Sequence, residues 1–440
     1  MQRATPSHQH RAGPRPHPSR RIAAGLGAAL LLLATACGGD DDASGGSGGN
    51  GGSDDGGPPA EEVLGTPNPA SGDPVKVGFI ADGRTPVLDN THMVPAAQAT
   101  VDYINEYQGG IAGRPIELVT CETEGDPGKA TNCGNQMVQD DVVLTIMPEN
   151  QQALAVHTVM AANDIPLFVY GVTDAAITED AESSFMLASL TSGLSALPIA
   201  VAEEEGIDRV TVMVVDVPAA TGFYEPGSVG AEEFDEAGID LEVVKIPLGA
   251  PDITPQVNEV VGGDDTVVHI VGDESLCIGA INGLATNGFE GPITVINTCV
   301  TDATKTALGA NMDGVVMASP TPIGDDANAG IQLWNAIVEK YAPDFDDPSK
   351  GLTTFITTYS ARQALEGLTG EVTAETVRST IKAAPEMPLV TGAGLNFRCN
   401  GKAAPDQPAV CTAGALRVTL DGDGNPVLPY EPFGEEHIPD

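Results

Sequence analysis

Short apolar runs alternate with longer amphipathic stretches along most of the chain after its first 74 residues. The first run, residues 75–80, is rich in β-branched side chains, which is typical of a strand covered on both faces. A stretch with one apolar side begins near Pro95 and ends at Gly109-Gly110, so it predicts a helix. Residues 116–120 form the next predicted strand. A strand, a helix and a strand in this order pair in parallel, and ligands of such sheets bind beyond the carboxyl ends of the strands.

The same alternation continues to about residue 320 and predicts two α/β lobes. Its further strand-like runs are residues 142–146, 166–170, 185–190, 209–215, 241–246, 266–271, 293–297 and 314–319. The run 185–190 has no clear helix before it, and Pro320-Thr321-Pro322 follows the last run, so we expect the chain to cross between lobes at these two points. We predict two doubly wound parallel-sheet lobes joined by a two- or three-segment hinge, which permits closure around a ligand. The expected boundaries are 75–190 with 321–391 for lobe 1, and 191–320 with 392–432 for lobe 2.

The C-terminal segment changes character. Residues 395–398 and 415–420 resemble antiparallel strands around a loop that Cys399 and Cys411 could close. The sequence DGDGN at 421–425 resembles the start of a calcium-binding loop, but it lacks the glycine and the glutamate that such a loop needs at its sixth and twelfth positions. We therefore interpret it as a hairpin turn.

The N-terminus predicts export. The first 36 residues contain five arginines and no acidic residue, and residues 22–36 are apolar and end in small side chains. This is the pattern of a secretory signal, and it is too short for a membrane-spanning helix. Ala34-Thr35-Ala36-Cys37 resembles a bacterial lipobox, which implies that Cys37 becomes the lipidated first residue; ordinary cleavage after Ala36 is the alternative. Residues 37–74, rich in Gly, Ser, Asp and Pro, predict a disordered tether.

Charge and cysteine content narrow the class of protein. The 62 acidic residues against 20 basic ones give a net charge of −42, which disfavours nucleic acid as a partner. Besides Cys37, six cysteines remain, an even number that predicts disulfides in an exported chain. Six cysteines allow 15 pairings. A metal cluster is the alternative, but the chain has no CxxC spacing and its histidines are scattered, so we expect no cofactor and no metal. Proximity in sequence favours the pairs Cys121–Cys133, Cys277–Cys299 and Cys399–Cys411.

Three segments carry a resemblance to a known family. VDYIN at residues 101–105 is followed by GGIAGR at 109–114, GDPGKA lies at 125–130, and IPLF at 165–168 precedes Thr173. In this order and spacing they resemble the type I periplasmic binding proteins, in particular the leucine/isoleucine/valine-binding branch of the ABC-transporter solute receptors. The resemblance covers roughly residue 75 to the C-terminus. It implies a monomeric receptor without enzymatic activity, which binds a small solute between its lobes and delivers it to an ABC permease at the outer face of the cell membrane.

The resemblance also implies where the solute binds. Amino-acid binders of this family hold the α-carboxylate with hydroxyl and loop N–H groups, and Thr173 matches a residue used in this way. Elsewhere this sequence departs from the family, because acids occupy several of the loops that should face the cleft. Uncompensated acids repel a carboxylate and favour a cation or a polyhydroxyl solute, so we expect a small polar solute such as an amino acid, amide or amine. The candidate ligand-binding residues are Glu149, Asn150, Gln151, Tyr170, Val172, Thr173, Asp216, Asp273, Glu274 and Thr298.

Other roles remain open. Thr173 and Asp273 could cap helices, and Tyr170 could simply pack in the core. The receptor could present its ligand to a membrane signalling protein instead of a permease. An exported hydrolase is a remote alternative, because residues 75–440 contain no GxSxG, HExxH or P-loop motif. The adjacent acids Asp273 and Glu274 are also poorly placed to lie on the two sides of a glycosidic bond.

Overall fold

The protein is described here by a computed structural model, which covers residues 59–85, 89–189, 191–263, 265–345, 347–412, 414–434 and 438–439. The predicted signal segment, Cys37 and residues 37–58 of the predicted tether lie outside the described residues. No helix in the described ranges is long and apolar enough to cross a membrane.

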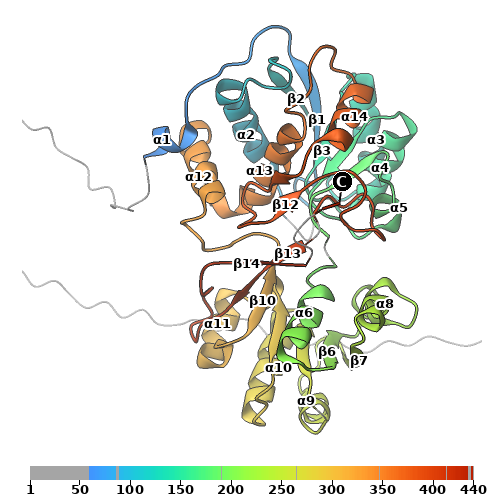
Figure 1. Ribbon diagram of the computed structural model, residues 1–440, viewed down its shortest axis with the longest axis vertical. Coiled ribbons are helices and arrows are strands. Elements are labelled where there is room, and N and C mark those ends of the chain that lie inside the picture. Colours follow the sequence, from blue (N-terminus) through green and yellow to red (C-terminus); the bar gives the residue numbers. More distant parts are fainter. Residues whose placement is uncertain are drawn as a thin grey trace, which may run out of the picture. The chain divides into compact units, whose positions relative to one another are not determined.

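The first sheet has five parallel strands in the order β2-β1-β3-β4-β5 (Figure 1). Its strands are β1 (Val75–Ala81), β2 (Ile116–Glu122), β3 (Thr145–Met147), β4 (Leu167–Val169) and β5 (Ser184–Met186). Each lies within or next to an apolar run from which the sequence predicts a strand. Gly78 in β1 lets a helix approach closely, because a Cβ atom there would lie 2.4 Å from the sulfur of Met137.

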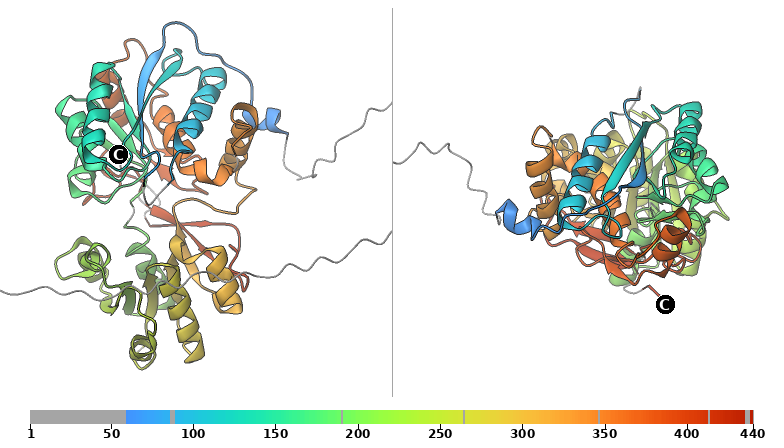
Figure 2. Two further views of the ribbon diagram at one scale, coloured as in Figure 1. Left: turned by 180° about the vertical axis from the view of Figure 1, so that it is seen from behind. Right: turned by 90° about the horizontal axis from the view of Figure 1, so that it is seen from above.

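Helices cover both faces of this sheet, so lobe 1 is doubly wound as predicted (Figures 1 and 2). One face packs against α2 and α13, with α12 beside them and α14 joining the same apolar core, while the other packs against α3 and α4. Trp334 lies in the first of these cores, and its Nε1 donates to the Pro348 carbonyl at 2.7 Å. The helices of this lobe are α2 (Met93–Tyr107), α3 (Pro127–Gln139), α4 (Ala153–Ala162), α5 (Ala175–Thr178), α12 (Ala329–Tyr341), α13 (Pro348–Gln363) and α14 (Ala374–Ala383).

The second sheet has seven strands in the order β14-β13-β10-β9-β8-β6-β7. The pairs β10–β13 and β13–β14 are antiparallel, and the other pairs are parallel, so β13 alone runs against the other strands of this sheet. Its strands are β6 (Arg209–Val215), β7 (Asp240–Ile246), β8 (Val267–Val271), β9 (Ile293–Ile296), β10 (Val316–Ser319), β13 (Gly414–Thr419) and β14 (Glu431–Gly434). One face packs against α6 and α8, and the other against α9, α10 and α11. The helical segments are α6 (Ala196–Glu205), α7 (Pro218–Thr221), η1 (Gly222–Tyr224), α8 (Val229–Glu236), α9 (Thr254–Val261), α10 (Glu274–Thr286), η2 (Asn297–Cys299), α11 (Asp302–Leu308) and η3 (Gly309–Met312).

The chain passes between the two lobes three times: between β5 and α6, between β10 and α12, and just before β13. Hydrogen bonds tie the crossing segments to their surroundings. The Tyr170 hydroxyl donates to the Pro320 carbonyl at 2.6 Å, directly after β10. The Gln407 side chain donates to the Thr191 hydroxyl at 3.1 Å and accepts from that of Ser189 at 3.2 Å. The fold is therefore the predicted two-lobed α/β architecture with a three-segment hinge.

The prediction of a disordered tether is wrong for residues 59–74. A short helix, α1 (Ala60–Leu64), packs against α12, and Leu64 is buried in the core of lobe 1. Downstream, the backbone N–H of Asn68 donates to the carbonyl of Glu106 at 2.9 Å. A few apolar side chains, Ala60, Val63 and Leu64, together with backbone hydrogen bonds hold this segment, and neither produces a pattern that composition reveals.

The predicted boundary between residues 391 and 392 also differs from the structure. Strands β11 (Met387–Pro388) and β12 (Asn396–Phe397) pair with each other in a separate small sheet, and Phe397 lies in the core of lobe 1. Val410 bridges to Met186 of β5. Residues 396–412 thus belong to lobe 1, and β13 pairs with β10 and β14 instead of with residues 395–398.

All three predicted disulfides are confirmed. Cys121–Cys133 joins β2 to α3, Cys277–Cys299 joins α10 to η2, and Cys399–Cys411 closes a loop on lobe 1. The predicted turn at residues 421–425 is confirmed as well. The Asp421 carboxylate accepts from the backbone N–H groups of Asp423 and Asn425, at 2.9 and 2.8 Å.

Candidate functional site

The strand order of each sheet reverses at one point, and polar residues follow the strands there. In the first sheet β2 and β3 lie on opposite sides of β1, and Asp82 and Glu149 follow β1 and β3. In the second sheet β7 and β8 lie on opposite sides of β6, and Asp216 and Asp273 follow β6 and β8. Ligands of open α/β sheets bind outside the carboxyl ends of the strands at such switch points. The topology thus marks one candidate region on each lobe.

Asp82 organises the region on lobe 1. Its side chain is only 2% exposed, and it accepts a hydrogen bond from the Thr123 hydroxyl at 3.0 Å. Its two carboxylate oxygens also accept from the backbone N–H of Gln151, at 3.1 and 3.2 Å. The Asn150 side chain donates to the same Thr123 hydroxyl at 3.3 Å. Asp82 therefore fixes the loop that presents Glu149, Asn150 and Gln151.

Asp82 is not among the residues predicted from the sequence to bind the solute. The available signal was its place as the first residue after the apolar run of β1, at the carboxyl end of a predicted strand. Loop acids are common, and only the strand order shows that this one lies at a switch point.

Glu149 is exposed to solvent, but protein atoms surround much of its carboxyl group. This desolvation raises the pKa of Glu149, and the nearby negative charge of Asp82 raises it further. Within the part of the chain that the structure describes, neither carboxylate forms an ion pair. The region is therefore electrostatically suited to a cation or a hydrogen-bond donor.

The loop after β4 differs from the prediction at Tyr170. Tyr170 is 2% exposed, and its hydroxyl already donates to Pro320, so it packs in the core instead of facing a solute. Its burial raises the pKa of its phenol, and the charge of Glu149 adds to the effect. The backbone N–H of Val172 donates to the sulfur of Met186 at 3.2 Å, so this N–H is occupied; the contact of Val172 with a solute stays a prediction.

The side chain of Thr173 remains available for contact with a solute. Its side chain is exposed, and Asp174, not Thr173, caps α5 by accepting from the N–H of Ala176 at 3.0 Å. The alternative role of Thr173 as a helix cap is therefore excluded. Its hydroxyl lies in the loop after β4, next in the sheet to the strand that carries Glu149.

On lobe 2, Asp216 and Asp273 are both exposed at the carboxyl ends of neighbouring strands. Asp273 also caps α10, because its side chain accepts from the N–H of Leu276 at 2.9 Å. Asp273 is therefore a helix cap, as the sequence allowed. The cap needs only one of its two carboxylate oxygens, and the solvent-facing side of the residue is not part of it.

The other two predicted residues of lobe 2 bind neighbouring loops. The Glu274 carboxylate accepts from the Thr301 hydroxyl at 2.6 Å, and the Thr298 hydroxyl donates to the Gly272 carbonyl at 3.0 Å. Both residues are exposed. These bonds connect the loops after β8 and β9, so Glu274 and Thr298 shape the edge on which Asp273 stands.

The arrangement is suited to binding. Among the residues that the structure describes, no three His, Cys, Asp or Glu side chains are grouped so as to hold a metal ion. Two doubly wound lobes joined by three crossings, with exposed acids or hydroxyls at the switch points of both sheets, define a two-lobed solute-binding protein.

Sequence comparison agrees with this class. The family model described as "Periplasmic binding protein" matches residues 74–412, and the chain belongs to this family. Members of the family are receptors without enzymatic activity, so this chain is a binding protein and not a hydrolase. The family and the three disulfides place it outside the cytoplasm. No curated protein matches the sequence significantly.

Solved structures share the fold at low sequence identity. An ABC transporter substrate-binding protein from Sphaerobacter thermophilus is 20% identical with a TM-score of 0.60, covering 84% of this chain and 98% of its own. The branched-chain amino acid transporter substrate-binding protein LivJ from Streptococcus pneumoniae, solved with isoleucine, is 17% identical with a TM-score of 0.57, covering 82% and 100%. The leucine-binding protein LivK from Thermotoga maritima is 16% identical with a TM-score of 0.55, covering 82% and 98%. These likenesses support the fold.

Proposed function

We propose that the protein is a lipid-anchored receptor that closes on a small polar solute and delivers it to an ABC permease. The observation that carries this proposal is the pair of switch points, each with exposed acids, on two lobes of a periplasmic binding protein. A solute held by Glu149 and Thr173 of one lobe and by Asp216 and Asp273 of the other would stabilise the closed form. A solute shifts the equilibrium between the open and closed forms only if it binds the closed form more tightly than the open one.

The electrostatics favour a solute with a positive or hydrogen-bond-donating group, such as an amine, an amide or an amino acid. The Glu149 carboxylate would repel a ligand carboxylate beside it, so the ammonium of an amino acid would lie toward Glu149. Its carboxylate would then lie near the Thr173 hydroxyl and loop N–H groups. LivJ of Streptococcus pneumoniae was solved with isoleucine, which carries both of these charged groups.

Solute identity can be found by a thermal-shift screen of the mature chain with amino acids, amines, amides and polyols at millimolar concentration. A solute that binds only the folded state raises the melting temperature. A hit is then titrated by calorimetry into Asp216→Ala and Asp273→Ala variants. We expect each substitution to weaken a cationic solute about tenfold, because a hydrogen bond to a charged group contributes about 1.5–3 kcal/mol.

Asp208→Ala is the matched control, because Asp208 is exposed just before the amino end of the strand that Asp216 follows. It removes the same charge from the opposite edge of the sheet and should leave the affinity unchanged. If Asp216→Ala and Asp273→Ala both bind as tightly as the parent, the proposed binding region is wrong.

The anchor and the output need tests in cells. Replacement of Cys37 by Ala should release the protein from the membrane fraction, whereas simple signal cleavage predicts no change. Deletion that abolishes uptake of the identified solute supports delivery to a permease. Altered gene expression with normal uptake would instead support a receptor that presents its ligand to a membrane signalling protein.

A further inference from the structure

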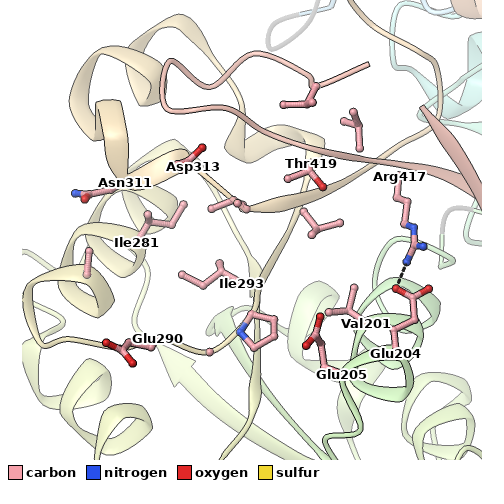
Figure 3. A pocket seen from close by; sticks show the side chains of 18 of the residues that line it. Val201, Glu204, Glu205, Ile281, Glu290, Ile293, Asn311, Asp313, Arg417 and Thr419 are labelled. Carbon is pink, nitrogen blue, oxygen red and sulfur yellow. Dashed lines mark hydrogen bonds and ion pairs between the residues drawn. The ribbon is translucent and has the colours of Figure 1, made fainter. Parts of the chain in front are cut away.

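A cavity lies at the opposite edge of the lobe 2 sheet, away from the carboxyl ends of its parallel strands β6 to β10. It has a volume of about 960 Å³ and is lined by the amino ends of β9 and β10, the carboxyl end of the antiparallel β13, and helices α6 and α10 (Figure 3). All of its lining residues belong to lobe 2. Nothing in the proposed solute-binding mechanism uses it.

Aliphatic side chains make up much of the cavity wall, and Figure 3 shows Val201, Ile281 and Ile293 around the cavity. Two further members of the wall, Val427 and Leu428, are 53% and 42% exposed. Covering large aliphatic side chains that are exposed at a concave surface removes apolar area from water, which favours binding of an apolar ligand. The wall therefore favours a ligand with a hydrocarbon part.

Acidic side chains surround this apolar wall. The single cation among the lining residues, Arg417, forms an ion pair with Glu204 at 2.7 Å (Figure 3). Its guanidinium also lies 3.7 Å from the carboxylate of Glu431. The pKa of the Arg417 guanidinium is raised, chiefly by its hydrogen bond to Glu204. Its charge is thus already neutralised within the wall.

Three further carboxylates of the wall have no cationic partner within the described part of the chain. They are Glu205, Glu290 and Asp313, and all three are exposed. A cavity with an aliphatic wall and uncompensated carboxylates around it attracts cations and repels fatty acids and other anionic amphiphiles.

The paired strands argue against an extended peptide as the ligand. β9, β10 and β13 are all internal strands of the sheet, hydrogen-bonded on both sides. No free strand edge of these three is available to add a peptide as a further strand. Recognition must then come from the side chains, by apolar contact and by charge.

We propose that this cavity is a second binding site, which takes a small amphiphilic cation: an aromatic or aliphatic group that carries an ammonium. Its volume lies in the range of small-molecule sites, about 300–1,000 Å³. The hydrocarbon part packs against Val427, Leu428 and Ile293, and the cation lies toward Glu290 and Asp313. The site is independent of the solute that binds at the carboxyl edges of the sheets.

The test uses the mature full chain and three probes of one shape: 4-phenylbutylamine, 4-phenylbutanol and 4-phenylbutyrate. Titration calorimetry should show saturable binding of the amine, about threefold to tenfold tighter than that of the alcohol, because exposed ion pairs contribute modestly. The butyrate should not bind. The preference for the amine should shrink at 0.5 M salt, which screens exposed charges.

Variants locate the binding. Glu290→Gln combined with Asp313→Asn should reduce the preference for the amine to within twofold of the alcohol, and Leu428→Ser should weaken both probes. The control pair, Glu117→Gln with Glu375→Gln, removes the same charge from exposed positions on lobe 1 and should change nothing.

Two results would overturn the proposal. The first is that 4-phenylbutylamine binds no more tightly than 4-phenylbutanol, or that it binds the Glu290→Gln/Asp313→Asn variant as tightly as the parent protein. The other is amine binding that disappears in the Asp216→Ala variant, which would place the amine at the solute region instead. Loss of solute binding in Asp216→Ala with unchanged amine binding would support both sites separately.

Discussion

His269 should make lobe 2 sensitive to mild acid. It lies in the middle of β8 with no exposed surface, and its Nδ1 is 2.9 Å from the Thr294 hydroxyl. Its Nε2 has no hydrogen-bond partner among the described residues. Burial lowers the pKa of His269 to about 3, because a charged imidazolium would lose its hydration there.

The sign and size of the effect follow from the two pKa values of His269. In the unfolded chain its pKa is the ordinary 6.5, so below that pH the unfolded state binds a proton that the folded state does not. The stability is fully present above pH 6.5 and falls as the pH drops from 6.5 toward 3. At about 1.4 kcal/mol per pH unit, His269 alone removes about 2 kcal/mol from the free energy of unfolding between pH 7.5 and pH 5.

The assay is urea denaturation of the parent and of His269→Gln at pH 7.5 and pH 5.0, followed by the fluorescence of a probe attached to lobe 2. All other titrating groups are common to both proteins, so their contribution cancels in the difference between the two pH dependences. The parent should lose about 2 kcal/mol more than His269→Gln over this interval.

Thr294→Val is the control, because it removes the hydrogen-bond partner of His269 but keeps the buried imidazole. It should be less stable than the parent at both pH values and keep the full pH dependence. If His269→Gln loses as much stability on acidification as the parent, the buried neutral histidine is not the cause and the reasoning fails.

Three further substitutions test the packing. Gly330→Ala should cost about 2–3 kcal/mol in urea denaturation, because its Cβ would lie 2.0 Å from the Val390 carbonyl oxygen; a neutral effect would show that the two segments separate easily. Tyr170→Phe removes the partner of the Pro320 carbonyl and should cost about 1–2 kcal/mol, with an unchanged circular dichroism spectrum; an unchanged melting temperature would contradict the role assigned to this bond. Thr373→Ala removes the capping box of α14 and should cost about 1 kcal/mol, and a loss below 0.3 kcal/mol would mean that the cap is dispensable.

Much of the fold could be predicted because buried parallel strands leave a clear pattern. Runs such as 209–215 are apolar on both faces, so they stand out from their surroundings. Two of the disulfides, Cys121–Cys133 and Cys277–Cys299, were predictable for a related reason, because each closes a short loop between elements that the βα alternation already brings together. Where contacts between residues distant in sequence decide the position of a segment, the sequence shows no such pattern. Leu64, with Ala60 and Val63, anchors α1 on lobe 1, and Phe397 draws residues 396–412 onto the same lobe against the apparent order of the strands.

The candidate site could be located by region but not by residue. The carboxyl ends of predicted strands led to Glu149 and Asp216, and the family resemblance led to Thr173; all three prove to be exposed in loops that follow strands. The same reasoning could not tell that Tyr170, one residue beyond its strand, turns its hydroxyl to Pro320. Nor could it tell which acids are buried, because that depends on hydrogen bonds between loops that are distant in sequence.

The placement of the disulfides has a mechanical consequence. Each bond closes its loop inside a single lobe, so oxidation stiffens the two lobes as separate bodies and adds no covalent link between them. These bonds use six of the seven cysteines of the chain, and the seventh is Cys37. In a Cys37→Ala variant, one new cysteine on each lobe would therefore give a pair of reactive thiols for fluorescent dyes. Energy transfer between the dyes would then report the movement of one lobe against the other as solute is added, without reducing any native disulfide.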